Sequence, residues 1–149
     1  MTALAVADGA SWKIVAAVID HARSPIAYDT AADSVASVTT AGPLAALPAS
    51  VTALKAALAK DLGVVVIGTD KGERAVGPKA AAKLLDRWSK LKLEMDTKVR
   101  EVRTKTWGYV QGNIDMVKGK ERYRMAVLLI ALPNADGTWS VGAVHYSSK

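Results

Sequence analysis

Two apolar runs separated by a turn cluster dominate the C-terminal part of the chain. The runs cover residues 122–132 and 138–147, and Pro133-Asn-Ala-Asp-Gly137 lies between them. This pattern predicts two antiparallel strands joined by a short loop. Because side chains alternate along a strand, one face of the second strand should carry Trp139, Val141, Ala143, His145 and Ser147. An imidazole at the end of an otherwise apolar row suits the wall of a pocket.

Helical spacing of apolar positions predicts three helices in the first 90 residues or so. From Ser11 to about Arg23, an amphipathic helix is indicated by Trp12, Val15, Ala16 and Ile19. An irregular connector over residues 26–50 should follow. A second helix should run from a Ser50 cap through Lys60, and Gly77-Pro78 should open a third helix with Trp88 on its apolar face.

The remaining apolar patterns predict strands. Val64–Ile67 is typical of a strand buried on both sides, and residues 68–73 should form a loop. Apolar and charged residues alternate over Lys92–Lys105, but the alternation shifts by one residue near Val102. This predicts one long strand with a β-bulge at Arg100 and Glu101. Trp107–Val117 should be the next strand. Helices before strands predict an α+β fold, with a curved antiparallel sheet wrapped around the helices.

Composition limits the class of protein. The chain has 149 residues, the size of one domain, so residues 1–149 are expected to form a single domain in which residues 51–149 are the core of the fold. Phe is absent, so the four tryptophans should carry much of the burial. Zero Cys and two distant His predict no disulfide and no metal site, and the lack of a phosphate loop or dinucleotide fingerprint predicts no cofactor. The start lacks a signal-peptide pattern and no apolar run could span a membrane, which predicts a cytoplasmic protein with no membrane partner.

The positive charge lies in the second half of the sequence. Before Gly77 there are 6 Lys and Arg against 7 Asp and Glu, and from Gly77 onward there are 14 against 7. Such a half could meet an anionic ligand or nucleic acid. Because acids are interleaved throughout it, a solvated face of mixed charge is the preferred interpretation, and nucleic-acid binding is not expected.

The candidate catalytic residues are His145 and Arg124. An unperturbed imidazole titrates near pH 6.5, so His145 could act as a general acid or base. It could equally be a structural histidine hydrogen-bonded at a sheet end. Arg124 and Arg122 could hold an anion beside it, or they could form a surface ladder with acids such as Glu94 and Asp96.

Two further groups are candidates for the lining of a pocket. Asp70 and Glu73 could do acid–base work at a pocket mouth, but the preferred explanation is turn formation at Asp70 and a favourable charge near a helix start at Glu73. One strand face should carry the polar and aromatic row Trp107, Tyr109, Gln111, Asn113 and Asp115. That row could line a pocket or form a dimer interface.

The segment from about Ala59 to Ser147 resembles SnoaL-like proteins of the nuclear-transport-factor-2-like superfamily, which includes ketosteroid isomerase. The resemblance rests on Val65–Glu73 followed by Gly77, on Trp107–Gly112, and on the Arg124 strand with Trp139 and His145. It implies a cone-shaped α+β fold with N-terminal helices packed in a curved antiparallel sheet.

The sequence therefore favours a domain that binds a small, partly apolar organic molecule between sheet and helices, as a homodimer packed through the sheet. The pocket residues expected are Trp107, Tyr109, Asp70, Trp88 and Trp139. One alternative is an isomerase, cyclase or dehydratase with His145 as the proton shuttle. Another is a non-catalytic dimerisation or interaction domain.

Overall fold

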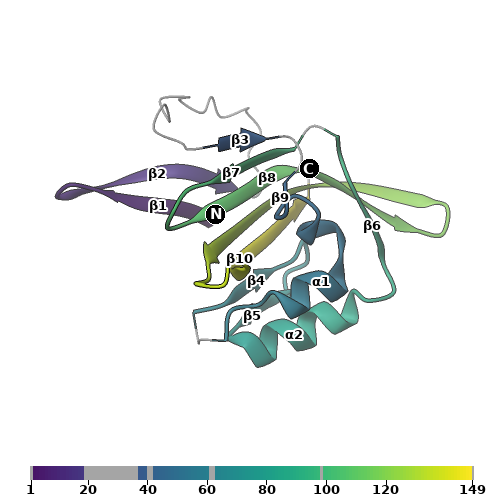
Figure 1. Ribbon diagram of the computed structural model, residues 1–149. Helices are drawn as coiled ribbons and strands as arrows, with labels where there is room; N and C mark the ends of the chain where they lie inside the picture. The colour runs from purple at the N-terminus through teal and green to yellow at the C-terminus, as the bar shows by residue number, and fades with distance from the viewer. Residues whose placement is uncertain (1, 19–36, 40–41, 61–62, 98, 149) are drawn as a thin grey trace.

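A computed structural model describes residues 2–18, 37–39, 42–60, 63–97 and 99–148 of the chain (Figure 1). Two helices and ten strands are found there, together with a short 3-10 helix. In chain order the elements are β1 Thr2–Asp8, β2 Ser11–Val18, β3 Ser37–Thr39, η1 Leu47–Ala49, α1 Val51–Ala56, β4 Val65–Ile67, β5 Arg74–Val76, α2 Pro78–Arg87, β6 Lys92–Met95, β7 Arg100–Arg103, β8 Gly108–Lys118, β9 Glu121–Pro133 and β10 Trp139–Ser148.

The architecture is α+β, with helices on one side of a curved sheet. The eight-stranded sheet has the order β3-β7-β8-β9-β10-β4-β5, and β6 pairs with β8 beside this path. Its neighbours are antiparallel except β4, which runs parallel to β10. Both α1 and α2 lie on the side of the sheet that we call the inner face, and the β1–β2 hairpin projects from one end (Figure 1). The opposite side is the outer face.

The helix starts follow from local sequence. The Ser50 side chain accepts a hydrogen bond from the Ala53 amide at 3.2 Å and caps α1, which ends at Ala56 and not at Lys60 as expected. Gly77 adopts φ 88° and allows the chain to turn into α2, whose first residue is Pro78. In the described part of the chain, no helix is long and apolar enough to span a bilayer.

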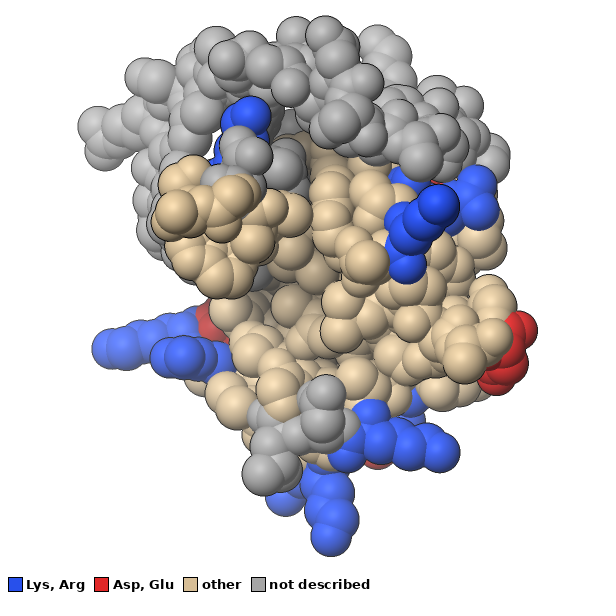
Figure 2. Space-filling model, turned by 60° about the vertical axis from the view of Figure 1, so that its left-hand side comes forward, with Lys and Arg blue, Asp and Glu red and all other residues tan. Residues whose placement is uncertain are grey.

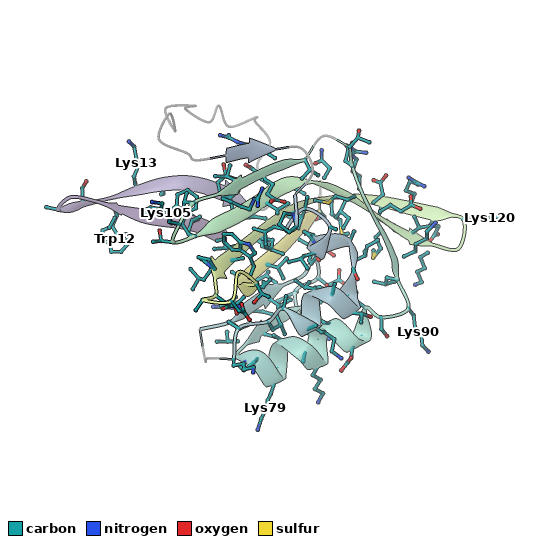
Figure 3. The ribbon with its side chains drawn as sticks, in the orientation of Figure 1. Trp12, Lys13, Lys79, Lys90, Lys105 and Lys120 are labelled. Atoms are coloured by element: carbon teal, nitrogen blue, oxygen red, sulfur yellow. The ribbon has the colours of Figure 1, made fainter. Side chains whose placement is uncertain are left out.

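The helix expected at the N-terminus is wrong. Ser11–Val18 is strand β2, which pairs with β1, and residues 19–23 lie outside the described residues, as does much of the 26–50 connector. Trp12 is 75% exposed at the end of the hairpin and points away from the sheet, so it does not contribute to the core (Figure 3). The apolar run from Ile14 to Val18 suits a strand as well as a helix, and pairing with β1 selects the strand.

The strand expected over Lys92–Lys105 is divided in two. Both β6 and β7 pair with β8: Met95 at the end of β6 pairs with Ile114, and Arg100 at the start of β7 pairs with Gln111, so four residues separate the two strands while two separate their partners in β8. An interruption of the strand is confirmed, but the bulge expected at Arg100 and Glu101 is wrong, because both residues pair with β8 in regular register. Two extra residues preserve the alternation, so Met95 and Glu101 still face the same side of the sheet.

The predicted C-terminal hairpin is confirmed as β9 and β10, but the expected shared face on β10 is wrong. The register shifts between Val141 and Ala143, so Gly142 is an extra residue. Val141 faces the helices, whereas His145 pairs with Leu128 and faces outward. The same shift turns Tyr146 inward, where it is 3% exposed.

Strand β4 confirms the strand expected over residues 64–67, and it lies between β10 and β5. The three-residue strand β5 is a feature that the sequence pattern did not predict. The sheet separates two apolar clusters. The larger one lies under the helices and includes Leu54, Leu85, Val110, Ile114, Leu129, Val141 and Val144. The smaller one lies on the outer face and contains Val102, Tyr109 and Leu128, with Leu4 of β1 packed against it.

A buried carboxylate fastens the segment that precedes η1 to the sheet. Glu101 of β7 is fully buried, and its Oε2 accepts hydrogen bonds from the backbone amides of Leu44 at 3.1 Å and Ala45 at 2.7 Å. Its Oε1 lies 2.9 Å from Nε of Arg103. Gly42 lies so close that a Cβ added there would fall 2.0 Å from Oε1. Backbone amides and one cation thus compensate the cost of burying this charge.

Candidate functional site

A cavity of about 150 Å³ opens between the inner face, the end of α2 and the loop joining β4 to β5. The sheet contributes side chains from β6, β8, β9 and β10, and the helix contributes its C-terminal end. The lining residues are Gly68, Thr69, Asp70, Glu73, Trp88, Leu91, Leu93, Met116, Lys118, Met125 and Tyr146. The strand and helix side chains are mainly apolar, and the acidic groups come from the β4–β5 loop.

Two aromatic side chains form one wall of the cavity. Trp88 and Tyr146 meet edge to face, with ring centroids 5.3 Å apart and an interplanar angle of 89°. Both are largely buried, at 7% and 3% exposure. The Tyr146 hydroxyl donates a hydrogen bond to the Pro48 carbonyl at 2.7 Å, and burial raises the pKa of this phenol. The wall is therefore rigid, because packing and hydrogen bonding hold both rings.

Glu73 is the most firmly held polar group of the cavity. The indole Nε1 of Trp88 donates to Glu73 Oε1 at 2.7 Å, and the Asp70 amide donates to Oε2 at 3.3 Å. The loop itself is closed by backbone bonds from Gly68 N to Glu73 O at 2.7 Å and from Glu73 N to Asp70 O at 2.9 Å. A tight turn and an indole therefore fix the position of this carboxylate.

Asp70 and Lys118 are the other charged groups of the lining, and both are exposed. Asp70 takes part in the turn, as the sequence suggested, and it also lies at the cavity. The turn expected at Asp70 is therefore confirmed, whereas Glu73 contacts Trp88 at the C-terminal end of α2 and not the start of that helix. Acid–base work by Asp70 or Glu73 stays a prediction. Together the three side chains give the lining two carboxylates and one ammonium group.

The expected pocket residues are divided among three places. Asp70 and Trp88 line the cavity. Trp139 lies on the inner face but lines a separate open groove beside α1, with Ala53, Lys60, Asn134 and Asp136 among its neighbours there.

Trp107 and Tyr109 belong to the outer cluster. Their rings stack at 6.2 Å with an interplanar angle of 10°, and burial raises the pKa of Tyr109 against a smaller opposing effect of Arg100. His145 is 1% exposed and also faces outward, where it pairs with Leu128. It does not line the cavity described above. An acid–base role for His145 stays a prediction and would require a ligand on the outer face.

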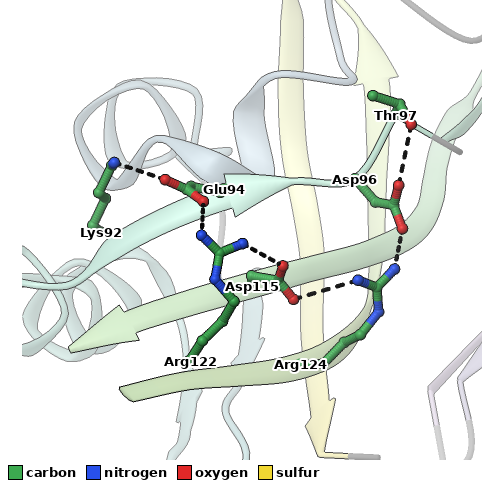
Figure 4. A network of polar contacts seen from close by, with 7 residues as sticks. All are labelled: Lys92, Glu94, Asp96, Thr97, Asp115, Arg122 and Arg124. Carbon is green, nitrogen blue, oxygen red and sulfur yellow. Dashed lines mark hydrogen bonds and ion pairs between the residues drawn. The ribbon is translucent and has the colours of Figure 1, made fainter. Parts of the chain in front are cut away.

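Arg124 lies in a charged network on the outer face (Figure 4). It forms an ion pair with Asp96 and reaches Asp115 at 3.6 Å. Its neighbour Arg122 forms two ion pairs, with Asp115 at 2.9 Å and with Glu94 at 2.8 Å. The hydrogen bond and charge of Lys92, with further contributions from Arg122, lower the pKa of Glu94.

This network is the surface ladder that was one of two interpretations of the arginines. Arg124 is 48% exposed and its guanidinium faces carboxylates of β6 and β8 instead of the cavity. A catalytic role for Arg124 stays a prediction. Among the described residues, no group of three or more His, Cys, Asp or Glu is placed to hold a metal ion.

Several cavity residues were not singled out from the sequence as pocket residues, among them Tyr146, Leu93, Met116 and Met125. Leu93 and Met95 alternate correctly in the sequence, which could have placed them on one face. Tyr146 could have been found only by treating Gly142 as a bulge, because an isolated glycine in a strand is a recognised sign of one.

The excess positive charge is not gathered on the face seen in Figure 2. Lys and Arg side chains stand around the margin of that face, and its centre carries uncharged residues. The labelled side chains Lys13, Lys79, Lys90, Lys105 and Lys120 also lie at separate positions around the molecule (Figure 3). This distribution fits the preferred interpretation of a solvated surface of mixed charge.

No protein-family model matches this sequence, and no curated protein does so either. Solved structures are similar in fold. A proposed ketosteroid isomerase from Parabacteroides distasonis aligns with a TM-score of 0.56 and 12% identity over 68% of this chain and 76% of its own. An NTF2-like protein of unknown function from Pseudomonas putida aligns with a TM-score of 0.56 and 12% identity, covering 70% and 77%.

A third solved structure, a proposed calcium/calmodulin-dependent protein kinase type II association domain from Thiobacillus denitrificans, has a TM-score of 0.52 and 21% identity over 70% of this chain and 86% of its own. The chain therefore has the nuclear-transport-factor-2-like fold, an α+β architecture with a curved sheet. The names of these neighbours indicate different functions, so the shared fold does not indicate which function this protein has.

Proposed function

We propose that this protein binds a small, partly apolar organic molecule in the cavity between α2 and the inner face of the sheet. The observation that carries the proposal is the lining itself, which joins aromatic and aliphatic walls to a few polar groups on one loop. Ligand sites commonly have this composition, because apolar walls supply affinity while a few polar groups fix orientation.

The size of the cavity limits the ligand. An apolar cavity of about 150 Å³ accommodates a single benzene ring. The cavity here has a similar volume, so the enclosed part of the ligand would be one ring or a short chain. A fused four-ring skeleton would extend beyond this enclosed volume, so the name of the isomerase neighbour does not by itself suggest the ligand.

Binding can be tested by NMR with methyl-labelled methionine. The chain contains four methionines, of which Met116 and Met125 line the cavity while Met95 does not. Benzyl alcohol, which carries one ring and one hydroxyl, should shift the methyl signals of Met116 and Met125 in a saturable way, because its ring current acts on both. The Met95 signal should move much less.

A pair of matched substitutions locates the site. Leu93→Trp places a larger side chain in the lining and should abolish the saturable shift. Leu132→Trp makes the same change at an exposed position of β9, 49% exposed, and should leave binding intact. Unshifted Met116 and Met125 signals in the unsubstituted protein, or equal binding by both variants, would contradict the proposal.

A further inference from the structure

We infer that the ligand of this cavity is a small organic cation, an amine attached to an apolar body of one ring or a short chain, with its ammonium group bound by Glu73. This inference rests on the proposed function, because it names the chemical class that the same cavity selects. Three properties of the site lead to it: a fixed carboxylate, a wall of aromatic rings and the balance of charge in the lining.

The first property is the fixed carboxylate of Glu73. Its two oxygens accept one hydrogen bond each, from the Trp88 indole and the Asp70 amide. A carboxylate offers about four acceptor positions, so Glu73 keeps capacity for a donor on a ligand. The carboxylate also lies close against Gly68, since a Cβ added there would fall 2.2 Å from Oε2. An ammonium group would therefore find a preorganised acceptor.

The charge of Glu73 is also not matched by the protein around it. Within the described ranges, no Lys or Arg forms an ion pair with Glu73 or with Asp70. The neighbours that do bind Glu73 are neutral N–H groups. A cationic ligand would supply the missing opposite charge at a half-buried position, where screening by water is reduced.

The second property is the aromatic wall. Trp88 donates to Glu73 and is itself part of the lining, so a group bound to the carboxylate lies near an indole ring. Tyr146 continues this wall at a centroid distance of 5.3 Å from Trp88. Aromatic faces attract ammonium groups, and Trp does so most strongly. The edge of Trp88 that meets Glu73 is its N–H edge, so this attraction requires the ammonium group to reach a ring face of the same lining. With that contact, a carboxylate and aromatic rings in one cavity favour a cation over a neutral or anionic ligand.

The third property is the balance of charge. Asp70 and Glu73 contribute two carboxylates to the lining, against the single ammonium of Lys118. Lys118 is exposed at the end of β8, so water surrounds and screens its charge. Because Lys118 is the one feature of the lining that favours an anion, an anionic probe of the same shape belongs in the test.

The test compares three single-ring probes in the methionine NMR titration at pH 7: benzylamine, benzyl alcohol and benzoate. Benzylamine should bind about tenfold or more tightly than benzyl alcohol, and benzoate should bind least. Glu73→Gln keeps an acceptor for the Trp88 indole but removes the charge, so it should abolish the preference for the amine and leave the affinity for benzyl alcohol within about twofold. Asp86→Asn removes a carboxylate of α2 that pairs with Lys55 outside the cavity, and it should preserve the preference.

Each contrary outcome has a distinct meaning. Equal binding of benzyl alcohol and benzylamine would overturn this inference and leave the proposed function standing, as would a preference for benzoate. Absence of a saturable shift with all three probes would overturn both. A preference for the amine that persists in Glu73→Gln would overturn the role of Glu73. Should that variant fold poorly, the comparison of the three probes on the unsubstituted protein still decides the chemical class.

Discussion

The contact between Gly42 and the buried carboxylate of Glu101 predicts a strong energetic coupling between these residues. Glu101→Ala leaves the buried amide of Leu44 without its acceptor and leaves that of Ala45 with only the Gly42 carbonyl, at 3.2 Å. Hydrogen bonds to a charged group contribute roughly 1.5–3 kcal/mol each, and release of a buried charge offsets part of that loss. We expect the substitution to lower the free energy of unfolding by about 3 kcal/mol.

Gly42→Ala should cost a similar amount for the same reason. Its new Cβ would lie 2.0 Å from Oε1, 2.3 Å from Cδ and 2.6 Å from Oε2 of Glu101, so the carboxylate has to move and releases both amides. The backbone of Gly42 does not require a glycine, because its φ lies outside the left-handed region. In the Glu101→Ala background the clash is absent, and Gly42→Ala should be nearly neutral there. The coupling energy should therefore be about 3 kcal/mol.

Urea denaturation of the four proteins of this cycle, followed by tryptophan fluorescence, measures the coupling. Gly72→Ala is the matched control, because a Cβ at Gly72 meets nothing within 4 Å. Additive effects, in which Gly42→Ala costs the same with and without the Glu101 side chain to within about 0.5 kcal/mol, would refute the reasoning. That result would mean that the carboxylate does not hold the segment before η1.

Three other predictions concern pH, surface charge and assembly. Burial raises the pKa values of Tyr146 and Tyr109 in the folded state, so unfolding midpoints in urea should be steady from neutral pH to about pH 10 and fall as the pH rises further. A smaller fall of the midpoint in Tyr146→Phe would assign part of this pH dependence to Tyr146, and an unchanged fall would exclude Tyr146 as its source. Arg124→Ala removes exposed ion pairs and should cost less than about 1 kcal/mol at low salt and still less in 1 M NaCl. A larger, salt-independent loss would contradict the surface role of the network. The homodimer stays a prediction from the sequence: light scattering should give twice the chain mass of 15.7 kDa, Leu132→Lys on the outer face should reduce it, and a monomeric mass would contradict it.

The sequence predicted those elements whose signals are local. The turn cluster Pro133–Gly137 located the final hairpin, Gly77-Pro78 located the start of α2, and the β-branched run located β4. Local signals were ambiguous at Ser11–Val18, where apolar spacing suits both a helix and a strand. There the partner strand β1 determines the outcome, and pairing between strands is not written in the spacing.

The cavity was harder to predict than the fold because its geometry depends on single residues and on distant contacts. Because Gly142 is an extra residue in β10, Tyr146 faces inward and His145 faces outward. The catalytic candidate His145 therefore points away from the cavity. The bond between Glu73 and Trp88 joins residues 15 positions apart on a loop and a helix end. Neither the inward position of Tyr146 nor the bond between Glu73 and Trp88 can be predicted from strand alternation alone.

The parallel pairing of β4 with β10 also bears on the order in which the chain folds. It joins residues 65–67 to residues 143–145, whereas β8, β9 and β10 pair with their neighbours in sequence through short turns. Contacts between distant segments form later, because closing a long loop costs more entropy than closing a short one. The meander should assemble first and β4 should dock last. Because the loop after β4 carries Asp70 and Glu73, the cavity would become complete only in the final stage of folding.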